Sequence, residues 1–217
     1  MKNAWLLVGI LMLAQTAVAG PLEEGWTLSK QGEGITVYTR PIPGLPMKEF
    51  MGEGDVDAPL AVVQQVFLDF PSYTQWYGMC KEFRLLKTLN DKPNHYIVYY
   101  VLSSPWPVKD RDMVLDIQTE DLSREGKVIL NIKAIPDELV PVSKKYVRMT
   151  RLIGKTTMTK VNDTKTHVVL TINSDPAGSV PIKLSDMVAK NQPFKTIQGL
   201  REMVKKDIYY QKAGVEK

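Results

Sequence analysis

The succession of extended segments with short connections constrains the fold of this chain more than any other feature. Alternating, β-branched runs predict strands, and these runs cover residues 35–39, 47–56, 83–89, 95–102, 113–119, 127–135, 146–153, 156–161 and 167–173. Turn-forming residues separate the later runs, namely Asn90-Asp91, Glu125-Gly126, Gly154 and Asn162-Asp163. Because parallel pairing would need long crossovers, we expect an antiparallel meander.

Two helical patterns complete the series. Asp57-Ala58-Pro59 predicts a helix start, with a carboxylate at the cap and a proline in the first turn, and Phe70-Pro71 predicts its end. Residues 73–80 are expected to be irregular or to form a second short helix. After Pro181, apolar residues recur in a helical pattern, namely Leu184, Val188, Phe194, Ile197, Leu200, Val204 and Ile208. The last four of them form a continuous apolar stripe. Pro193 is expected to kink or restart this last helix.

The N-terminus has the organisation of a secretory signal peptide. Met1-Lys2-Asn3 is a short positive segment, and residues 4–14 form an apolar core that is too short to span a bilayer comfortably. Ala17-Val18-Ala19 then supplies the small residues that signal peptidase needs. An uncleaved anchor is the alternative. We expect residues 1–19 to be removed, residues 20–217 to form a single domain, and the protein to be periplasmic or secreted.

Composition narrows the classes of partner. Lysine and arginine total 28 against 24 aspartate and glutamate residues, and the basic residues are scattered rather than gathered in runs. We therefore expect no nucleic-acid partner. Cys80 is the only cysteine, so an exported chain has no internal disulfide and must be stable through its core. The thiol of Cys80 is expected to be buried rather than nucleophilic.

Several short stretches occur in an order that resembles one family. They are Gly34-Ile35-Thr36-Val37-Tyr38, Tyr73 and Trp76 ahead of Cys80, Val98-Tyr99-Tyr100, residues 105–112 (PWPVKDRD) and residues 175–181 (DPAGSVP). Together they resemble the START domain, the steroidogenic-acute-regulatory-protein-related lipid transfer family, as an exported bacterial member. The resemblance spans residues 26–210. It implies an α+β helix-grip fold, in which a curved antiparallel sheet wraps around a long C-terminal helix, and this agrees with the order of elements above.

The resemblance also implies a tunnel for one lipid between the sheet and the helix. The expected function is the non-catalytic binding and transfer of a single hydrophobic ligand by a monomer that touches a membrane surface transiently and needs no cofactor. The helix from Ser185 to Ile208 is expected to line one wall, and inward strand residues the other. The candidate ligand-binding residues are Trp76, Tyr99, Arg111, Met113, Val128, Leu130, Met149, Met187, Phe194, Ile197, Leu200 and Val204.

The triplet Asp110-Arg111-Asp112 has two interpretations. Neighbours on a strand face opposite ways, so alternation places both carboxylates on one face and Arg111 on the other. In the first interpretation the triplet only fixes the start of its strand. In the second, Arg111 points inward and orients a polar group of the ligand, which would require a buried carboxylate or hydroxyl partner.

Catalytic and metal-binding motifs are not apparent in the sequence. His95 and His167 are isolated, and neither has a second histidine at metal-ligand spacing. The chain has no GxSxG, phosphate loop or CxxC motif. Two alternatives to a carrier stay open. One is an enzyme of the polyketide cyclase or aromatase type with the same fold, and the other is an interaction module with a filled core.

Overall fold

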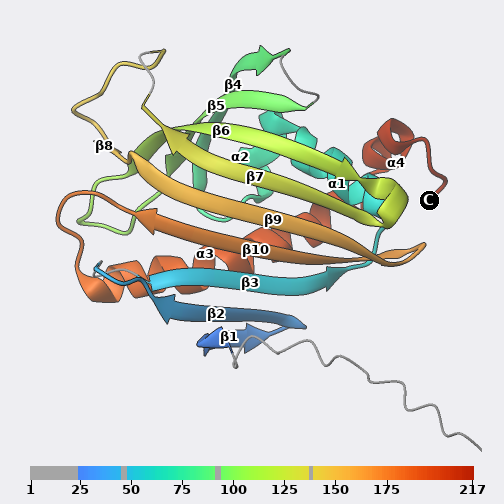
Figure 1. The fold of residues 1–217 in the computed structure, drawn as a ribbon, viewed down its shortest axis with the longest axis horizontal. Helices are drawn as coiled ribbons and strands as arrows, with labels where there is room; N and C mark the ends of the chain where they lie inside the picture. Colours follow the sequence, from blue (N-terminus) through green and yellow to red (C-terminus); the bar gives the residue numbers. More distant parts are fainter. Residues whose placement is uncertain (1–23, 45–47, 91–93, 137–138) are drawn as a thin grey trace, which may run out of the picture.

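A single curved sheet organises the structure (Figure 1). The computed structural model describes residues 24–44, 48–90, 94–136 and 139–217, so the predicted signal peptide lies outside the described residues. Within them, ten strands follow the order β1-β2-β3-β10-β9-β7-β6-β5-β4, with β8 paired to β6. The strands are β1 (Thr27–Gly32), β2 (Ile35–Pro41), β3 (Lys48–Val56), β4 (Cys80–Leu89), β5 (His95–Leu102), β6 (Arg111–Leu122), β7 (Lys127–Ile135), β8 (Val147–Arg148), β9 (Arg151–Asn162) and β10 (Lys165–Asp175). The predicted antiparallel sheet is confirmed, and the short β8 pairs parallel to β6.

Alternating burial shows why these segments form strands with one inner face. In β9, Leu152, Thr156 and Met158 are buried. The turn predicted at Gly154 is wrong, because β9 continues through it to Asn162. A side chain at Gly154 would place its Cβ 2.7 Å from Cδ1 of Ile172 on β10. Glycine therefore leaves room for the side chain of Ile172 to lie over β9 at this position.

Four α-helices accompany the sheet in the described residues. They are α1 (Leu60–Leu68), α2 (Tyr73–Trp76), α3 (Ile182–Met203) and α4 (Asp207–Ala213), with single 3₁₀ turns η2 (Phe70–Ser72) and η3 (Ser123–Glu125). The long helix α3 lies behind the sheet in Figure 1 and packs against β2 and β3. Its presence confirms the predicted helix-grip arrangement.

Three details of the helix predictions need correction. Pro193 does not restart the last helix, because α3 runs through it to Met203. Ile208 does not continue the buried stripe, since it lies in the separate helix α4 and is 48% exposed. Asp57 does not cap α1. The cap position is Pro59, and the carboxylate of Asp57 lies 3.6 Å from the amine of Lys165.

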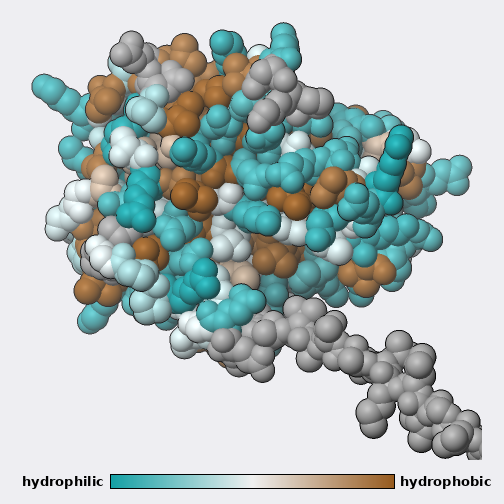
Figure 2. Space-filling view, viewed as in Figure 1, coloured by the Kyte–Doolittle hydropathy of each residue, from teal (hydrophilic) through white to brown (hydrophobic). Residues whose placement is uncertain are grey.

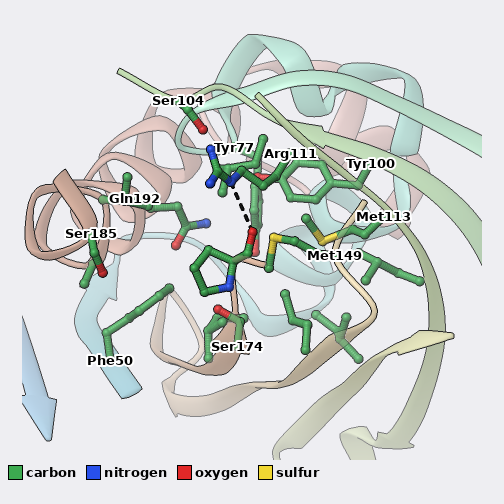
Figure 3. A pocket seen from close by; sticks show the side chains of 18 of the residues that line it. Phe50, Tyr77, Tyr100, Ser104, Arg111, Met113, Met149, Ser174, Ser185 and Gln192 are labelled. Atoms are coloured by element: carbon green, nitrogen blue, oxygen red, sulfur yellow. Dashed lines mark hydrogen bonds between the residues drawn. The ribbon is translucent and has the colours of Figure 1, made fainter. Parts of the chain in front are cut away.

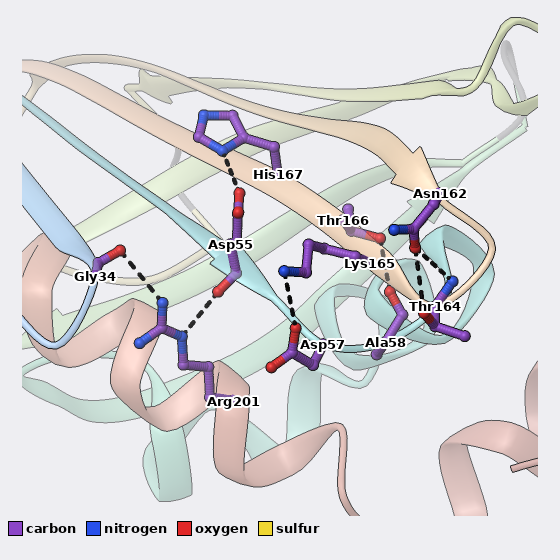
Figure 4. A network of polar contacts seen from close by, with 10 residues as sticks. All are labelled: Gly34, Asp55, Asp57, Ala58, Asn162, Thr164, Lys165, Thr166, His167 and Arg201. Carbon is purple, nitrogen blue, oxygen red and sulfur yellow. Dashed lines mark hydrogen bonds and ion pairs between the residues drawn. The ribbon is translucent and has the colours of Figure 1, made fainter.

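Arg201 ties the end of α3 to the edge of the sheet (Figure 4). Its guanidinium donates hydrogen bonds to the carbonyl of Asp55 at 2.8 Å and of Glu33 at 2.6 Å. A third bond of 3.4 Å reaches the carbonyl of Gly34, which has a positive φ of 65° in the β1–β2 turn. These bonds fix the C-terminal half of α3 against β2 and β3.

The C-terminal half of α3 is also close-packed against α2 and the turn after it. A Cβ added at Gly199 would lie 2.2 Å from the carbonyl oxygen of Trp76. A Cβ added at Gly78 would lie 2.2 Å from the carbonyl oxygen of Gln192. Glycine at both positions therefore allows backbone to meet backbone, which leaves no space under this half of the helix.

A second, smaller apolar cluster lies on the outer face of the sheet. Ile97, Tyr99, Val101 and Val114 form it on β5 and β6, and Val140 and Tyr146 pack over them. Figure 2 shows this outer face, where hydrophilic side chains dominate and hydrophobic ones gather towards the end that holds β4, β5 and β8. The main core lies on the opposite, inner face.

Candidate ligand-binding cavity

A cavity lies between the inner face of the sheet and the N-terminal half of α3 (Figure 3). The centres of water molecules can occupy about 100 Å³ of it, and the empty space between its walls, including the part open to solvent, is about 1150 Å³. One face of α3 forms a wall, with residues spaced by about one helical turn. These residues are Leu184, Ser185, Val188, Ala189 and Gln192.

The remaining walls are mainly apolar and come from inward-facing strand residues and from the helices α1 and α2. Prominent among them are Phe50, Phe67, Tyr73, Tyr77, Phe83, Tyr100, Leu102, Met113, Leu115, Ile117, Leu130, Ile132, Met149, Leu152 and Ile172. Lys48 and Arg111 are the two charged residues in the described wall, which includes no carboxylate. The amine of Lys48 lies 3.3 Å from a carboxylate oxygen of Asp186 on α3, and both of these side chains are partly exposed.

The length of the cavity can be estimated from the residues of strand β6 that line it. Arg111, Met113, Leu115 and Ile117 all line it from alternate positions of this strand. At a rise of about 3.3 Å per residue, they extend over roughly 20 Å. Arg111 stands at the end beside the loops that contain Pro105 and Pro176, and the opposite end is mainly apolar, with Thr156 in its wall.

Arg111 is buried at that loop end, with 3% of its surface exposed. Its Nε donates to the carbonyl of Pro176 at 3.2 Å, as Figure 3 shows, and Nη2 donates to the carbonyl of Ala177 at 3.4 Å. A further bond from Nη1 reaches the carbonyl of Lys109. Burial lowers the pKa of Arg111 from its ordinary value, and the nearby charge of Asp110 opposes that shift. Arginine nevertheless stays protonated in proteins.

The two aspartates beside Arg111 face away from the cavity wall and pair with other cations. Asp112 is 1% exposed, accepts two bonds from Arg148 at 3.1 and 2.8 Å, and accepts a third from the hydroxyl of Tyr99 at 3.0 Å. Asp110 pairs with the amine of Lys81 at 2.5 Å. The alternation predicted for the triplet is confirmed, and Arg111 is the member that points inward.

Two buried phenols face the cavity near Arg111. Burial raises the pKa of Tyr77 to about 12, and a hydrogen bond with Gln192 opposes this rise. Burial also raises the pKa of Tyr100 well above its ordinary value. The hydroxyl of Tyr100 has no hydrogen-bond partner among the described residues. It is therefore a protonated donor that no described part of the protein satisfies.

The sequence matches the family model described as the START domain over residues 14–207. The chain belongs to the START-domain family. The uncharacterized protein PA1579 of Pseudomonas aeruginosa is 30% identical to this START domain over 202 residues, which cover 93% of this chain and 98% of that protein.

Solved structures agree with this assignment. A STAR-related lipid transfer protein from Xanthomonas axonopodis has a TM-score of 0.74 and 32% identity, over 84% of this chain and 99% of that one. Human StAR-related lipid transfer protein 5 has the same TM-score of 0.74 at 21% identity, over 88% of each chain, and so shows a likeness of fold.

Four of the twelve predicted ligand-binding residues of this START domain line the cavity. They are Arg111, Met113, Leu130 and Met149. Their contact with a ligand stays a prediction. The partner expected for an inward Arg111 was a carboxylate or a hydroxyl, whereas main-chain carbonyls accept its hydrogen bonds in the described structure.

Tyr99 and Trp76 need correction as polar or aromatic contributors to ligand orientation. Tyr99 lies in the outer cluster because it alternates with Tyr100 on β5, and the guanidinium of Arg84 covers its ring at 4.8 Å. Trp76 is buried, but it packs edge-on against Phe67 with ring centroids 5.2 Å apart and does not line the cavity. Its indole donates to the hydroxyl of Ser72 at 3.2 Å.

The other six predicted residues lie outside the cavity wall. Met187 is 36% exposed on the solvent side of α3. Phe194 lies under β1, where the amine of Lys30 stands 3.8 Å above its ring. The rest belong to the filled part of the main core, namely Val128, Ile197, Leu200 and Val204. The candidate ligand-binding residues on α3 were therefore chosen outside its hollow part, although Leu184 and Val188 of the predicted helical pattern do line the cavity.

Sequence analysis did not select several residues that line the cavity. Tyr100 and Leu102 could have been found from the alternation of β5, which turns both towards the inner face once Tyr99 faces out. On α3, Ala189 and Gln192 follow Ser185 at steps of four and three, but they are small or polar and did not stand out from an apolar stripe.

The cysteine and the two histidines of this START domain lie outside the described cavity wall. The thiol of Cys80 is half-buried rather than buried, and burial raises its pKa to about 12, which disfavours the nucleophilic thiolate. His95 pairs with Asp116 at 2.9 Å, and His167 pairs with Asp55 at 2.8 Å. In the described ranges, no group of three or more potential ligands could hold a metal ion, and no helix is long and apolar enough to cross a membrane.

Proposed function

We propose that this START domain binds a single lipid in the cavity and carries it between membranes without catalysing a reaction. The observation that carries this proposal is the apolar cavity that follows β6 from Arg111 to Ile117. Its length of roughly 20 Å exceeds the ~15 Å depth of hydrocarbon in one leaflet of a bilayer. An extended acyl chain of a membrane lipid can therefore fit along it.

The free energy of lipid transfer explains why an enclosed apolar cavity suits a carrier. A lipid that leaves a membrane exposes its chain to water, at about 0.8 kcal/mol per methylene group. A chain of sixteen carbons therefore meets a barrier on the order of 13 kcal/mol. Wall residues such as Met113 and Met149 can offset this by covering the chain, and their flexible thioethers adapt to its shape.

Kinship supports the same proposal. The Xanthomonas axonopodis structure bears the name of a STAR-related lipid transfer protein and matches this chain over 84% of its length at 32% identity. The described cavity wall includes neither a histidine nor a carboxylate, and the phenol of Tyr77 has its pKa raised to about 12 by burial. The described wall thus offers no side chain suited to act as a general base near neutral pH, which favours a carrier over a cyclase-type enzyme.

We further propose that the loops at the Arg111 end touch the membrane. Trp106 is 91% exposed between Pro105 and Val108, which line the cavity, and Ile182 is 62% exposed at the start of α3. Lys109 lies on the same loop as Trp106. Exposed apolar side chains beside basic ones suit the interface of an anionic membrane. The periplasmic or secreted location and the monomeric state remain part of the proposal.

Native mass spectrometry of the full chain, purified from the cells that produce it, tests lipid binding. We expect a mass increase from one bound lipid, and extraction should then give its identity. The variant Ala189→Phe should lose most of this adduct because its ring projects from α3 into the cavity. Met187→Phe, on the solvent side of the same helix, is the matched control and should keep it.

A bare chain mass, together with no uptake of a fluorescent fatty acid or phospholipid, would contradict the carrier. Turnover of a bound cyclic or polyketide substrate that is lost in Ala189→Phe would instead support the enzyme.

A further inference from the structure

The cavity contains one buried positive charge for which the described structure provides no ion-pair partner. Arg111 is 3% exposed and lines the wall, and its hydrogen bonds go to the carbonyls of Pro176, Lys109 and Ala177. These acceptors are neutral. The nearby charge of Asp110 stabilises Arg111 in part, but Asp110 is already paired with Lys81. An anion brought by the ligand would stabilise the buried cation further.

The carboxylates adjacent to Arg111 in the sequence are engaged elsewhere. Asp110 pairs with Lys81 at 2.5 Å, and Asp112 forms two bonds with Arg148 on the outer face. The triplet therefore contains two carboxylates, each with a cation of its own. No described residue contributes a carboxylate to the cavity wall.

Arg111 keeps hydrogen-bonding capacity for a ligand. A guanidinium group has five N–H donors in a planar fork that matches the oxygens of a carboxylate or a phosphate. Three of its bonds reach carbonyls in the described structure. Two N–H groups form no hydrogen bond in the described structure and can donate to an anionic group.

Tyr100 provides a second donor at the same end. In the register of β5 and β6, Leu102 lies opposite Arg111 and Tyr100 lies opposite Met113. Tyr100 and Arg111 are therefore diagonal neighbours on the inner face, a separation that long side chains can bridge. The hydroxyl of Tyr100 is buried without a partner, and its raised pKa keeps it a donor.

Two further hydroxyls surround this end of the cavity. Ser104 and Ser174 both line the wall, and Figure 3 shows them on opposite sides of Arg111. The end beside the loops thus combines a cation with hydroxyl groups, whereas the wall beyond Met113 is mainly apolar, with Leu115 and Ile117 in it and Thr156 as a polar exception. The charge of Arg111 therefore distinguishes one end of the cavity from the other.

We propose that the ligand is an anionic amphiphile whose carboxylate or phosphate group lies against Arg111 and the hydroxyl of Tyr100. Its apolar chain then follows β6 towards Ile117. This inference rests on the proposed function and specifies its ligand class: a neutral lipid of the same length would bring no anion to pair with Arg111.

Binding of three ligands with the same sixteen-carbon chain tests the ligand class on the unmodified full chain. Palmitate, hexadecyl phosphate and hexadecanol should each be titrated against a fluorescent fatty acid, below their micelle concentrations. We expect at least one of the two anions to bind about tenfold or more tightly than the alcohol, since hydrogen bonds to charged groups are the stronger ones. Whichever anion binds more tightly distinguishes a carboxylate from a phosphate ligand.

Variants at two positions test whether Tyr100 and Arg111 cause the preference for anions. Tyr100→Phe removes only the unpartnered hydroxyl, so it should fold normally and bind the preferred anion about fivefold more weakly, with the alcohol unchanged. Arg111→Gln should abolish the preference for anions, and Arg111→Lys should restore part of it. Arg124→Gln, an exposed arginine in η3, is the control for a general loss of positive charge.

The outcomes separate this inference from the proposed function. Equal affinity for the alcohol and both anions would overturn the ligand class while leaving a lipid carrier. An anion preference that persists in both Tyr100→Phe and Arg111→Gln would overturn the assigned subsite. No binding of any of the three compounds, nor of the fluorescent fatty acid itself, would count against the carrier. If Arg111→Gln fails to fold, Tyr100→Phe and the three-ligand comparison still decide.

Discussion

The two halves of α3 pack against the protein in different ways, although they belong to one continuous helix. The half from Leu184 to Gln192 covers a cavity, whereas Ile197, Leu200 and Met203 are at most 3% exposed in a filled core. The period of buried positions is the same in both halves. What differs is the structure that faces the helix. Glycines bring the backbone of α2 and of the turn after it close to α3 only from Gln192 onwards.

The glycines explain this difference physically. Gly78 and Gly199 let α2 and the following turn approach within backbone contact of α3 from Gln192 onwards. Towards the N-terminal end of α3, the opposing surface is the curved sheet, and the cavity lies between the two. Helical periodicity therefore reports burial, and close backbone approach decides whether a buried face is filled or hollow.

The largest expected difference between the halves comes from matched leucine truncations. Leu200→Ala should lower the free energy of unfolding by about 4 kcal/mol, because it removes a fully buried side chain and leaves a cavity. Leu184→Ala should lower it by less than about 1 kcal/mol, because this half-buried leucine already faces empty space. Urea unfolding of both variants gives the comparison, and equal losses would show that the two halves are packed alike.

In the filled half, the replacement of a glycine by alanine should lower stability, which is the opposite of its usual effect in a helix. Alanine normally stabilises a helix relative to glycine by about 1 kcal/mol. Gly199→Ala should instead destabilise by about 3 kcal/mol, because its Cβ would lie 2.2 Å from the carbonyl oxygen of Trp76. Lys195→Ala, at an exposed position of the same helix, should change stability by less than about 0.5 kcal/mol. Unchanged or higher stability of Gly199→Ala would refute the close contact.

Alkaline pH should reveal the burial of Tyr77, where the filled and hollow regions meet. Its folded pKa is about 12, against an ordinary value of 10.0. Between these values the unfolded chain has released the proton and the folded chain retains it, so stability is unaffected below pH 10 and falls as pH rises towards 12. Unfolding measured from pH 8 to 11.5 should show a shallower fall for Tyr77→Phe than for the unmodified protein. Identical slopes would mean that Tyr77 titrates normally.

The smallest effect is expected from adding volume to the hollow half. Ala189→Leu should leave stability unchanged or raise it by up to about 1 kcal/mol, since the longer side chain enters existing space. Ala58→Leu, at a position 1% exposed in the core outside the cavity wall, should lower it by about 2 kcal/mol. Thermal unfolding compares the pair, and a clear loss for Ala189→Leu would indicate that the space is smaller than described.

Sequence patterns predicted most of the sheet because burial alternates along its strands. The exceptions have physical causes. β1 has the sequence TLSKQG and lies at the edge of the sheet with no buried residue, so it carries little apolar signal. Gly154 resembled a turn residue, but its lack of a side chain makes room for the side chain of Ile172 on the paired strand β10. This requirement depends on a residue distant in sequence.

The sequence predicted which way Arg111 faces, but not which other groups surround it or which part of α3 is hollow. Alternation within Asp110-Arg111-Asp112 indicated that Arg111 faces away from both carboxylates, and this is confirmed. The same rule could not show that the carbonyls of Pro176 and Ala177 accept its hydrogen bonds, because they belong to a loop more than sixty residues away. It also could not show which half of α3 is hollow, since that depends on Gly78 and Gly199 meeting the helix.

The position of β10 in the sheet has a consequence for the timing of folding. β10 is hydrogen-bonded to β3 on one side and to β9 on the other. The two hairpin-linked strands β2 and β3 therefore have no link to the rest of the sheet until residues 57–164 have been made, which takes about 5 to 20 seconds of synthesis. If the predicted signal peptide directs export, this late closure leaves an interval in which the polypeptide is still unfolded enough to thread through a translocation channel.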